Sequence, residues 1–157
     1  IKFATASFLE HKWSDFEETL VGELKAAFYA CKAVAPSMIE QQQGCIVAIS
    51  SAASRIPTPG LISHNTAKSG IDGFVKSLAL ELGPHGIRVN AVAPGLTQTD
   101  STASIPQVMK DAAIGMTPLR RIAEPDDIAR AILLLASSEA NFITGTYLPV
   151  SGGIQML

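Results

Sequence analysis

Apolar residues recur at every third or fourth position in two long segments of the chain, which is the spacing of half-buried helices. The first segment begins near Ser14 and Glu17, whose spacing matches a helix-capping box, and we expect it to end in the Ala35–Pro36 region. The second covers residues 65–82, and Gly83 is suited to cap its carboxyl end. The predicted core-facing residues are Phe16, Leu20, Leu24, Phe28, Cys31 and Val34 in the first helix, and Ile71, Phe74, Val75, Leu78 and Leu82 in the second.

Three shorter segments are predicted as strands. Residues 45–49 form a continuous apolar run, which is typical of a strand covered on both faces. Residues 87–92 form the next strand, which ends at Pro94-Gly95. The last strand is residues 146–150, and Pro149 favours an edge position for it because proline cannot donate a hydrogen bond to a neighbouring strand.

A further helix is predicted to begin at Pro125, with Asp126 and Asp127 in its first turn, where carboxylates interact favourably with the helix dipole. The order is therefore helix, strand, helix, strand, a polar excursion, helix and strand. This order indicates right-handed crossovers and a parallel sheet with helices on both faces. The predicted fold is a single α/β domain with three parallel strands flanked by helices. The core face of the helix after Pro125 is Ile128, Ala131, Ile132 and Leu135.

Candidate chemistry gathers where the first two strands end. Ser51 follows the first strand and Pro94-Gly95 ends the second, so both should face the crevice beyond the carboxyl ends of a parallel sheet. His64 and Lys68 are four residues apart, so in a helix their side chains share one face. Taken singly, each of these residues is more often a turn, cap or surface residue. Their joint order and spacing is much less easily explained by chance.

Composition narrows the function classes. The 157 residues suit one domain, and 47% of them are hydrophobic, enough for a substantial core. A net charge of −2 does not favour a nucleic acid or an anionic membrane as partner, and no apolar run approaches the roughly 18 residues of a membrane span. Cys31 and Cys45 are expected to be buried free thiols, consistent with a cytoplasmic protein.

With these motifs in order, the chain resembles the short-chain dehydrogenase/reductase family, especially its 3-oxoacyl-[acyl-carrier-protein] reductase-like members. The resemblance covers essentially the whole chain. It implies a doubly wound, Rossmann-like parallel sheet, of which this chain would be the carboxyl-terminal half. The segments that carry it are FLEHKWSDFEETLVGELKAAF, GCIVAISSAAS, the helix after His64, GIRVNAVAPGLTQTD, PLRRIAEPDDIA and ITGTYLPVSGG.

The resemblance implies a role for each matching residue. Ser51 matches the serine that hydrogen-bonds the substrate carbonyl or hydroxyl, and Lys68 matches the lysine that binds the nicotinamide ribose and lowers the pKa of the proton donor. The excursion at residues 100–118 matches a substrate lid, with residues 101–116 as its mobile part. The loop that holds the nicotinamide end of an NAD or NADP cofactor is matched by Pro94, Gly95 and Thr99. The implied substrate is a small or acyl-carrier-bound carbonyl compound, and the implied assembly is a homo-oligomer.

Three departures from the family pattern accompany these matches. His64 stands where the family has its tyrosine, the general acid/base of hydride transfer. Glu23 stands where the family has an asparagine of its proton relay. The Gly-rich phosphate-binding turn is absent from this sequence, which starts at Ile1 about where the segment after the family's fourth strand would begin. We therefore expect a piece of something longer, and we expect this chain by itself to bind no dinucleotide.

The charge of Lys68 affects the protonation of the neighbouring His64. A nearby ammonium stabilises a tyrosinate but opposes an imidazolium, so Lys68 should keep His64 a neutral imidazole and a poor acid. A metal site on His64 and Glu23 would rest on two residues alone, and we predict none. Two interpretations stay open. The chain is either part of an NAD(P)-dependent oxidoreductase or a catalytically inactive relative that serves as an oligomerisation or partner-binding module, and an unpaired edge of the first strand supports self-association.

Overall fold

The computed structural model describes residues 5–156 and contains one three-stranded parallel sheet. Strand β1 (Gly44–Ile49) pairs with β2 (Ile87–Pro94), which in turn pairs with β3 (Tyr147–Val150), so that the sheet order is β1-β2-β3. The predicted α/β fold is confirmed. The edge position of β3, predicted from Pro149, is confirmed as well.

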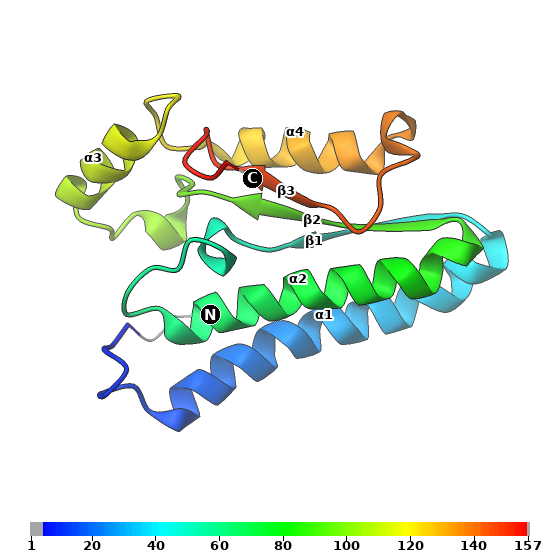
Figure 1. The fold of residues 1–157 in the computed structure, drawn as a ribbon, viewed down its shortest axis with the longest axis horizontal. Coiled ribbons are helices and arrows are strands. Elements are labelled where there is room, and N and C mark those ends of the chain that lie inside the picture. Colours follow the sequence, from blue (N-terminus) through cyan, green and yellow to red (C-terminus); the bar gives the residue numbers. More distant parts are fainter. Residues whose placement is uncertain (1–4, 157) are drawn as a thin grey trace.

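Helices cover both faces of this sheet, and Figure 1 shows α1 and α2 side by side on one face with α4 on the other. Helix α3 lies beyond the carboxyl ends of the strands, at the end of the sheet where the candidate site residues are expected (Figure 1). The bounds of the helices are Trp13–Gln41 for α1, Ile62–Leu82 for α2, Gln107–Met116 for α3 and Pro125–Ala136 for α4.

The core lies between α2 and the central strand β2. Every fourth residue of the inner stripe of α2 is buried, because positions four apart in a helix lie on one face. Helix α1 covers this cluster from outside, mainly through Leu24, Ala27 and Ala35. The buried cluster consists of Ile71, Val75, Ala79, Leu82, Ile87, Val89 and Ala91.

Both predicted ends of α1 are wrong. The amino-terminal cap is Lys12, with no side-chain capping bond, so Ser14 lies inside the first turn. The helix also continues through Pro36 to Gln41, where Gln42 closes it in a left-handed conformation with φ 50°. The hydrogen bond lost at Pro36 is offset because the extra turn packs Met38 and Ile39 against the core.

The predicted inner face of α1 is correct only in part. Cys31 is buried and Leu24 packs against the core, but Phe28 and Val34 are 47% and 42% exposed. Ala27 and Ala35 face the core instead, because small side chains allow α1 to lie close to the helix and sheet beneath it. The larger apolar residues of α1 therefore form an exposed surface.

Gly83 caps the carboxyl end of α2 as predicted, but the left-handed glycine of this turn comes later. Gly83 is right-handed, with φ −54°, and the chain continues as a short 3-10 turn over Gly83–His85. Gly86 then supplies the left-handed residue, with φ 71°. A Cβ atom there would lie 2.5 Å from the carbonyl oxygen of Gln42, so the close approach of these two turns requires glycine.

Strand β1 is an edge strand within the described residues, as the sequence predicted. It is only half-buried, and Ile49 at its end is 44% exposed. Both cysteines are free thiols; Cys31 is buried, whereas Cys45 is half-buried and so less covered than predicted. In the part of the chain that the structure describes, no helix combines the length and apolar composition needed to cross a membrane.

Candidate active site

Close packing of α1 on α2 brings the first group of predicted site residues together. Gly70 of α2 lies against Leu24 of α1, and a Cβ atom on this glycine would lie 3.1 Å from a methyl carbon of that leucine. The absence of a side chain at this point lets the two helices approach closely. The neighbouring side chain Glu23 can therefore reach across to α2.

Glu23 divides its two carboxylate oxygens between two basic residues of α2. One oxygen lies 2.6 Å from the Lys68 ammonium, and the other lies 3.8 Å from Nδ1 of His64. The three side chains are nearly buried, with exposed fractions of 9% for Glu23 and 14% for each of its partners. Charges in such a place interact more strongly than charges on an open surface.

The electrostatics of Glu23 follow from these contacts. Burial raises the pKa of its carboxyl group, because a desolvated carboxylate is less stable. Hydrogen bonds from His64 and Lys68, together with their charges, act in the opposite direction and outweigh the burial. The pKa therefore lies below its ordinary value of 4.5, and Glu23 is a carboxylate at neutral pH.

Lys68 also connects this cluster to the sheet. Its ammonium donates a hydrogen bond to the carbonyl oxygen of Ile49 at 3.1 Å, at the carboxyl end of β1. An ammonium has three N–H bonds, and the contacts with Glu23 and Ile49 occupy two of them. A third donor therefore fits a hydroxyl group such as that of a nicotinamide ribose.

Ser51 lies two residues beyond that carbonyl, at the start of a short 3-10 turn (Ala52–Ser54). Its hydroxyl oxygen accepts a hydrogen bond from the backbone N–H of Ala53 at 3.1 Å. Accepting this bond leaves the hydroxyl hydrogen available for another acceptor, such as a carbonyl oxygen of a substrate. Its own carbonyl oxygen lies 3.1 Å from the Tyr147 hydroxyl, which also lies 2.7 Å from Oε1 of Gln155.

A second polar cluster, which the sequence did not reveal, also holds the turn that carries Ser51. Asp72 of α2 accepts hydrogen bonds from the hydroxyls of Ser50 and Ser54, and the Arg55 side chain lies 4.0 Å away. The guanidinium of that arginine stacks over the Tyr147 ring, 3.7 Å from its centre. In the sequence, the one sign of this cluster is the carboxylate of Asp72, four residues after Lys68. The side chains that contact it come close to it only in the folded chain.

The predicted nicotinamide loop lies at the end of β2. The backbone N–H of Gly95 donates to the Val150 carbonyl at 3.0 Å, and a Cβ atom on this glycine would lie 3.0 Å from Cα of Ser151. Glycine thus allows the loop to lie close to the carboxyl-terminal segment. Thr99 caps a short 3-10 turn, and its hydroxyl lies 3.2 Å from that of Thr102. No contact joins this loop to Glu23 or Lys68 among the interactions of residues 5–156 described above.

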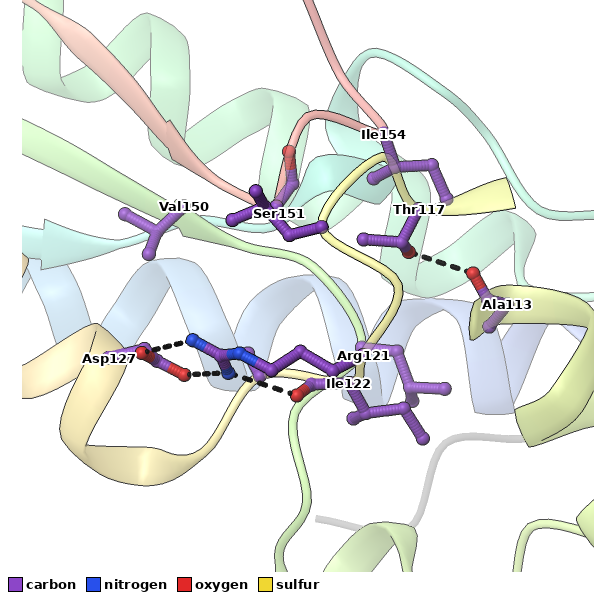
Figure 2. Close-up of a pocket in the computed structure, with 12 residues that line it drawn as sticks. Ala113, Thr117, Arg121, Ile122, Asp127, Val150, Ser151 and Ile154 are labelled. Carbon is purple, nitrogen blue, oxygen red and sulfur yellow. Dashed lines mark hydrogen bonds and ion pairs between the residues drawn. The ribbon is translucent and has the colours of Figure 1, made fainter. Parts of the chain in front are cut away.

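A small cavity of about 120 Å³ lies between α3, the loop after β2 and the carboxyl-terminal segment (Figure 2). Its lining is mostly apolar. At one wall, the Arg121 guanidinium forms a two-pronged ion pair with the Asp127 carboxylate and also bonds the Ile122 carbonyl at 3.2 Å, as Figure 2 shows. This arginine lowers the pKa of Asp127 well below its usual range. The pair holds the start of α4 against the segment that follows α3.

Metal binding finds little support in this geometry. Over residues 5–156, no group of three or more histidine, cysteine, aspartate or glutamate side chains is arranged to hold a metal ion. His64 and Glu23 face each other as a pair, and their nearest charged neighbour is the Lys68 ammonium, a competitor for the carboxylate rather than a ligand.

Two departures that the sequence presented as separate are adjacent in the structure. His64 and Glu23, which the family resemblance matched to a tyrosine and an asparagine, face each other across α1 and α2 at 3.8 Å. From the sequence, Lys68 is the one charged group expected beside His64. The structure adds a carboxylate that contacts both residues.

Comparison with known proteins identifies the family of this chain. A family model described as "Enoyl-(Acyl carrier protein) reductase" matches residues 1–155. The 3-oxoacyl-[acyl-carrier-protein] reductase FabG of Vibrio cholerae is 38% identical over 148 residues, which cover 94% of this chain and 59% of the relative. The 3alpha-hydroxysteroid dehydrogenase of Mediterraneibacter gnavus is 40% identical over 148 residues, again 94% of this chain and 59% of the relative.

A solved structure extends the likeness to three dimensions. The crystal structure of 3-oxoacyl-[acyl-carrier protein] reductase from Brucella melitensis superimposes with a TM-score of 0.89 at 33% identity, covering 100% of this chain and 59% of that one. The chain thus spans less than two thirds of the length of each of these relatives. It belongs to the short-chain dehydrogenase/reductase family and is similar to its 3-oxoacyl-[acyl-carrier-protein] reductases.

Proposed function

We propose that this chain is the carbonyl-facing part of an NAD(P)-dependent oxidoreductase that reduces a ketone or oxidises a secondary alcohol. The substrate is small or bound to an acyl carrier, as the names of the relatives suggest. The observation that carries the proposal is the cluster of Glu23, His64 and Lys68 tied to the end of β1. This is the end of a parallel sheet at which ligands bind.

Each residue has a distinct task in this proposal. The Ser51 hydroxyl donates a hydrogen bond to the substrate oxygen and orients it. His64 transfers a proton to or from that oxygen. Lys68 uses its third N–H bond to hold the cofactor, and the loop of Pro94, Gly95 and Thr99 holds the nicotinamide end. When bound, the nicotinamide supplies or accepts the hydride.

The phosphate end of the cofactor needs residues that this sequence does not contain. No Gly-rich turn of the G-x-G-x-x-G type occurs in the 157 residues. We propose that the chain acts together with such a dinucleotide-binding half as a longer cytoplasmic protein. The chain by itself then binds NADH and NADPH only weakly, because the pyrophosphate contributes a large part of the binding contacts.

Titration of the chain with NADH and with NADPH tests whether tight cofactor binding needs the dinucleotide-binding half. We expect that micromolar concentrations of the chain do not saturate the change in nicotinamide fluorescence. We also expect oxidation of NADH or NADPH by an acetoacetyl thioester once the upstream coding sequence, with an in-frame Gly-rich turn, is expressed with it. His64→Ala should abolish that oxidation. Micromolar binding of either cofactor by the chain alone would refute that need, and full activity of His64→Ala would refute the proposed proton transfer.

One observation favours a second function, an inactive relative that works as an oligomerisation module. The outer face of α1 exposes large apolar residues: Trp13 is 69% exposed, Tyr29 is 60% and Phe28 is 47%. Apolar side chains gathered on one helix support self-association. Both functions predict a homo-oligomer by light scattering, and only the oxidoreductase predicts turnover of a carbonyl substrate.

A further inference from the structure

The most unusual feature of the site is that one carboxylate, that of Glu23, contacts two basic side chains. Glu23 lies 2.6 Å from the Lys68 ammonium and 3.8 Å from Nδ1 of His64, and all three side chains are nearly buried. Among the ion pairs of residues 5–156, the charged groups next to the imidazole are this carboxylate from α1 and the ammonium one turn along α2. Their charges have opposite signs, so their effects on an imidazolium oppose each other.

We infer that Glu23 is a positioning residue that lets His64 hold a proton beside Lys68, so that the imidazolium can act as the acid in carbonyl reduction. This rests on the proposed function, which it extends by assigning the charge balance of the acid. Without the carboxylate, the ammonium would repel the imidazolium and leave a neutral ring, a poor acid at neutral pH. With it, the protonated cluster carries one net positive charge instead of two.

The geometry gives the two ring nitrogens different tasks. Nδ1 faces the carboxylate, so its N–H is the one that Glu23 orients and stabilises. We assign the other ring nitrogen, Nε2, as the one that gives its proton to the substrate. In reduction, the hydride adds to the carbonyl carbon, the Nε2 proton adds to the oxygen, and the imidazolium becomes neutral imidazole. The cofactor is oxidised, and His64 takes a new proton from water.

The same argument explains why two substitutions occur together. A tyrosine donor becomes an anion when it releases its proton, and a nearby carboxylate opposes that charge. A histidine donor starts as a cation, and the same carboxylate favours it. Glu23 is therefore useful beside His64 and unfavourable beside a tyrosine, so the two departures form one functional unit.

The effect of Glu23→Gln on the reduction rate, measured with His64 and again with His64→Tyr, tests this pairing. In the full-length protein, Glu23→Gln should lower carbonyl reduction at neutral pH about tenfold, because an opposite charge at such a distance changes the protonation ratio by about that factor or more. In the His64→Tyr background, the same Glu23→Gln change should leave the rate unchanged or raise it. A merely structural glutamate would lower the rate in both backgrounds, and that result would overturn the inference.

The protonation of the ring can be measured without any activity. Nitrogen-15 NMR of the chain should show a ratio of imidazolium to imidazole at His64 about tenfold lower in Glu23→Gln than in the wild type. Glu17→Gln, an exposed carboxylate on the same helix, is the matched control and should change nothing. Adding Lys68→Met to Glu23→Gln should restore part of the ratio, which also covers the case in which the single variant folds poorly.

The two readouts separate the two claims. A wild-type protein that turns over no carbonyl compound, yet shows the Glu23-dependent imidazolium, would remove the proposed function and keep the charge balance. An active wild type whose Glu23→Gln variant has unchanged rate and unchanged ring protonation would keep the proposed function and overturn the inference.

Discussion

Two nearly buried carboxylates lie beside α2, and the structure satisfies them in opposite ways. Glu23, 9% exposed, faces an ammonium and an imidazole, both of which can carry a positive charge. Asp72, 11% exposed, accepts from two serine hydroxyls, and within residues 5–156 its one ion pair is with the more distant Arg55 guanidinium. One carboxylate is held by charges, and the other is held mainly by neutral donors.

The difference separates proton movement from positioning. An imidazole is a side chain that can exchange a proton near neutral pH, whereas an ammonium stays charged there, so the Glu23 cluster can change its charge through His64 during a reaction. Serine hydroxyls do not titrate in that range, so the Asp72 cluster keeps its charge and fixes the turn that carries Ser51.

Removing the ammonium should have the largest effect. Lys68→Met leaves the Glu23 carboxylate nearly buried with only His64 to compensate its charge, and the loss of one partner from a buried pair destabilises by about 3 kcal/mol. Urea unfolding at neutral pH measures it. Lys76→Met, an exposed lysine of the same helix, is the control. If both variants lose the same small amount, Glu23 is not the charge-held carboxylate described above.

Asp72 should give a somewhat smaller loss. Asp72→Ala leaves the hydroxyls of Ser50 and Ser54 without their acceptor, which should lower the free energy of unfolding by about 2 kcal/mol. Glu81→Ala, an exposed carboxylate on α2, is the control for removing a negative charge. Asp72→Asn keeps one acceptor oxygen and should lose less than Asp72→Ala; equal losses would mean that charge, and not hydrogen bonding, is what this cluster needs.

The hydroxyl of Tyr147 tests how firmly the Ser51 turn is held. Tyr147→Phe keeps the ring under Arg55 but removes the hydroxyl, whose one hydrogen bonds either the Ser51 carbonyl or Oε1 of Gln155, so we expect a loss of about 1 kcal/mol in thermal or urea unfolding. Tyr29→Phe, at a tyrosine that is 60% exposed, should lose almost nothing. Equal stability of the two variants would remove the positioning role of the Tyr147 hydroxyl.

The fold and the site differ in how far the sequence predicts them. The order of helices and strands follows from apolar spacing, which reports local periodicity directly. The ends of α1 do not, because continuation through Pro36 depends on the packing of Met38 and Ile39 against residues that are distant in sequence. Ends of elements are decided by tertiary contacts, which a local pattern does not contain.

The same distinction applies to the two clusters. The spacing of His64 and Lys68 places them on one helical face, and family resemblance singled out Glu23. Their mutual contact arises only when α1 packs on α2. The Asp72 cluster joins α2, the turn after β1 and β3, whose residues are far apart in the sequence. No spacing rule connects Ser54 with Tyr147, so only the folded chain brings that cluster together.

The pH dependence of stability should provide the smallest and most specific test of the charge-held carboxylate. The pKa of Glu23 in the folded chain lies below its ordinary value of 4.5, because the bonds and charges of His64 and Lys68 outweigh the effect of burial.

A carboxyl group with a lowered folded pKa contributes stability above its unfolded pKa and loses it as the pH falls through the folded value. The stability of the wild type relative to Glu23→Gln should therefore decline as the pH falls below about 4.5. Urea midpoints measured for both proteins from neutral to acid pH provide the comparison, with Glu17→Gln as the exposed control. A difference that stays flat through the acid range would show that Glu23 is held by shape and not by charge, and the contrast with Asp72 would then disappear.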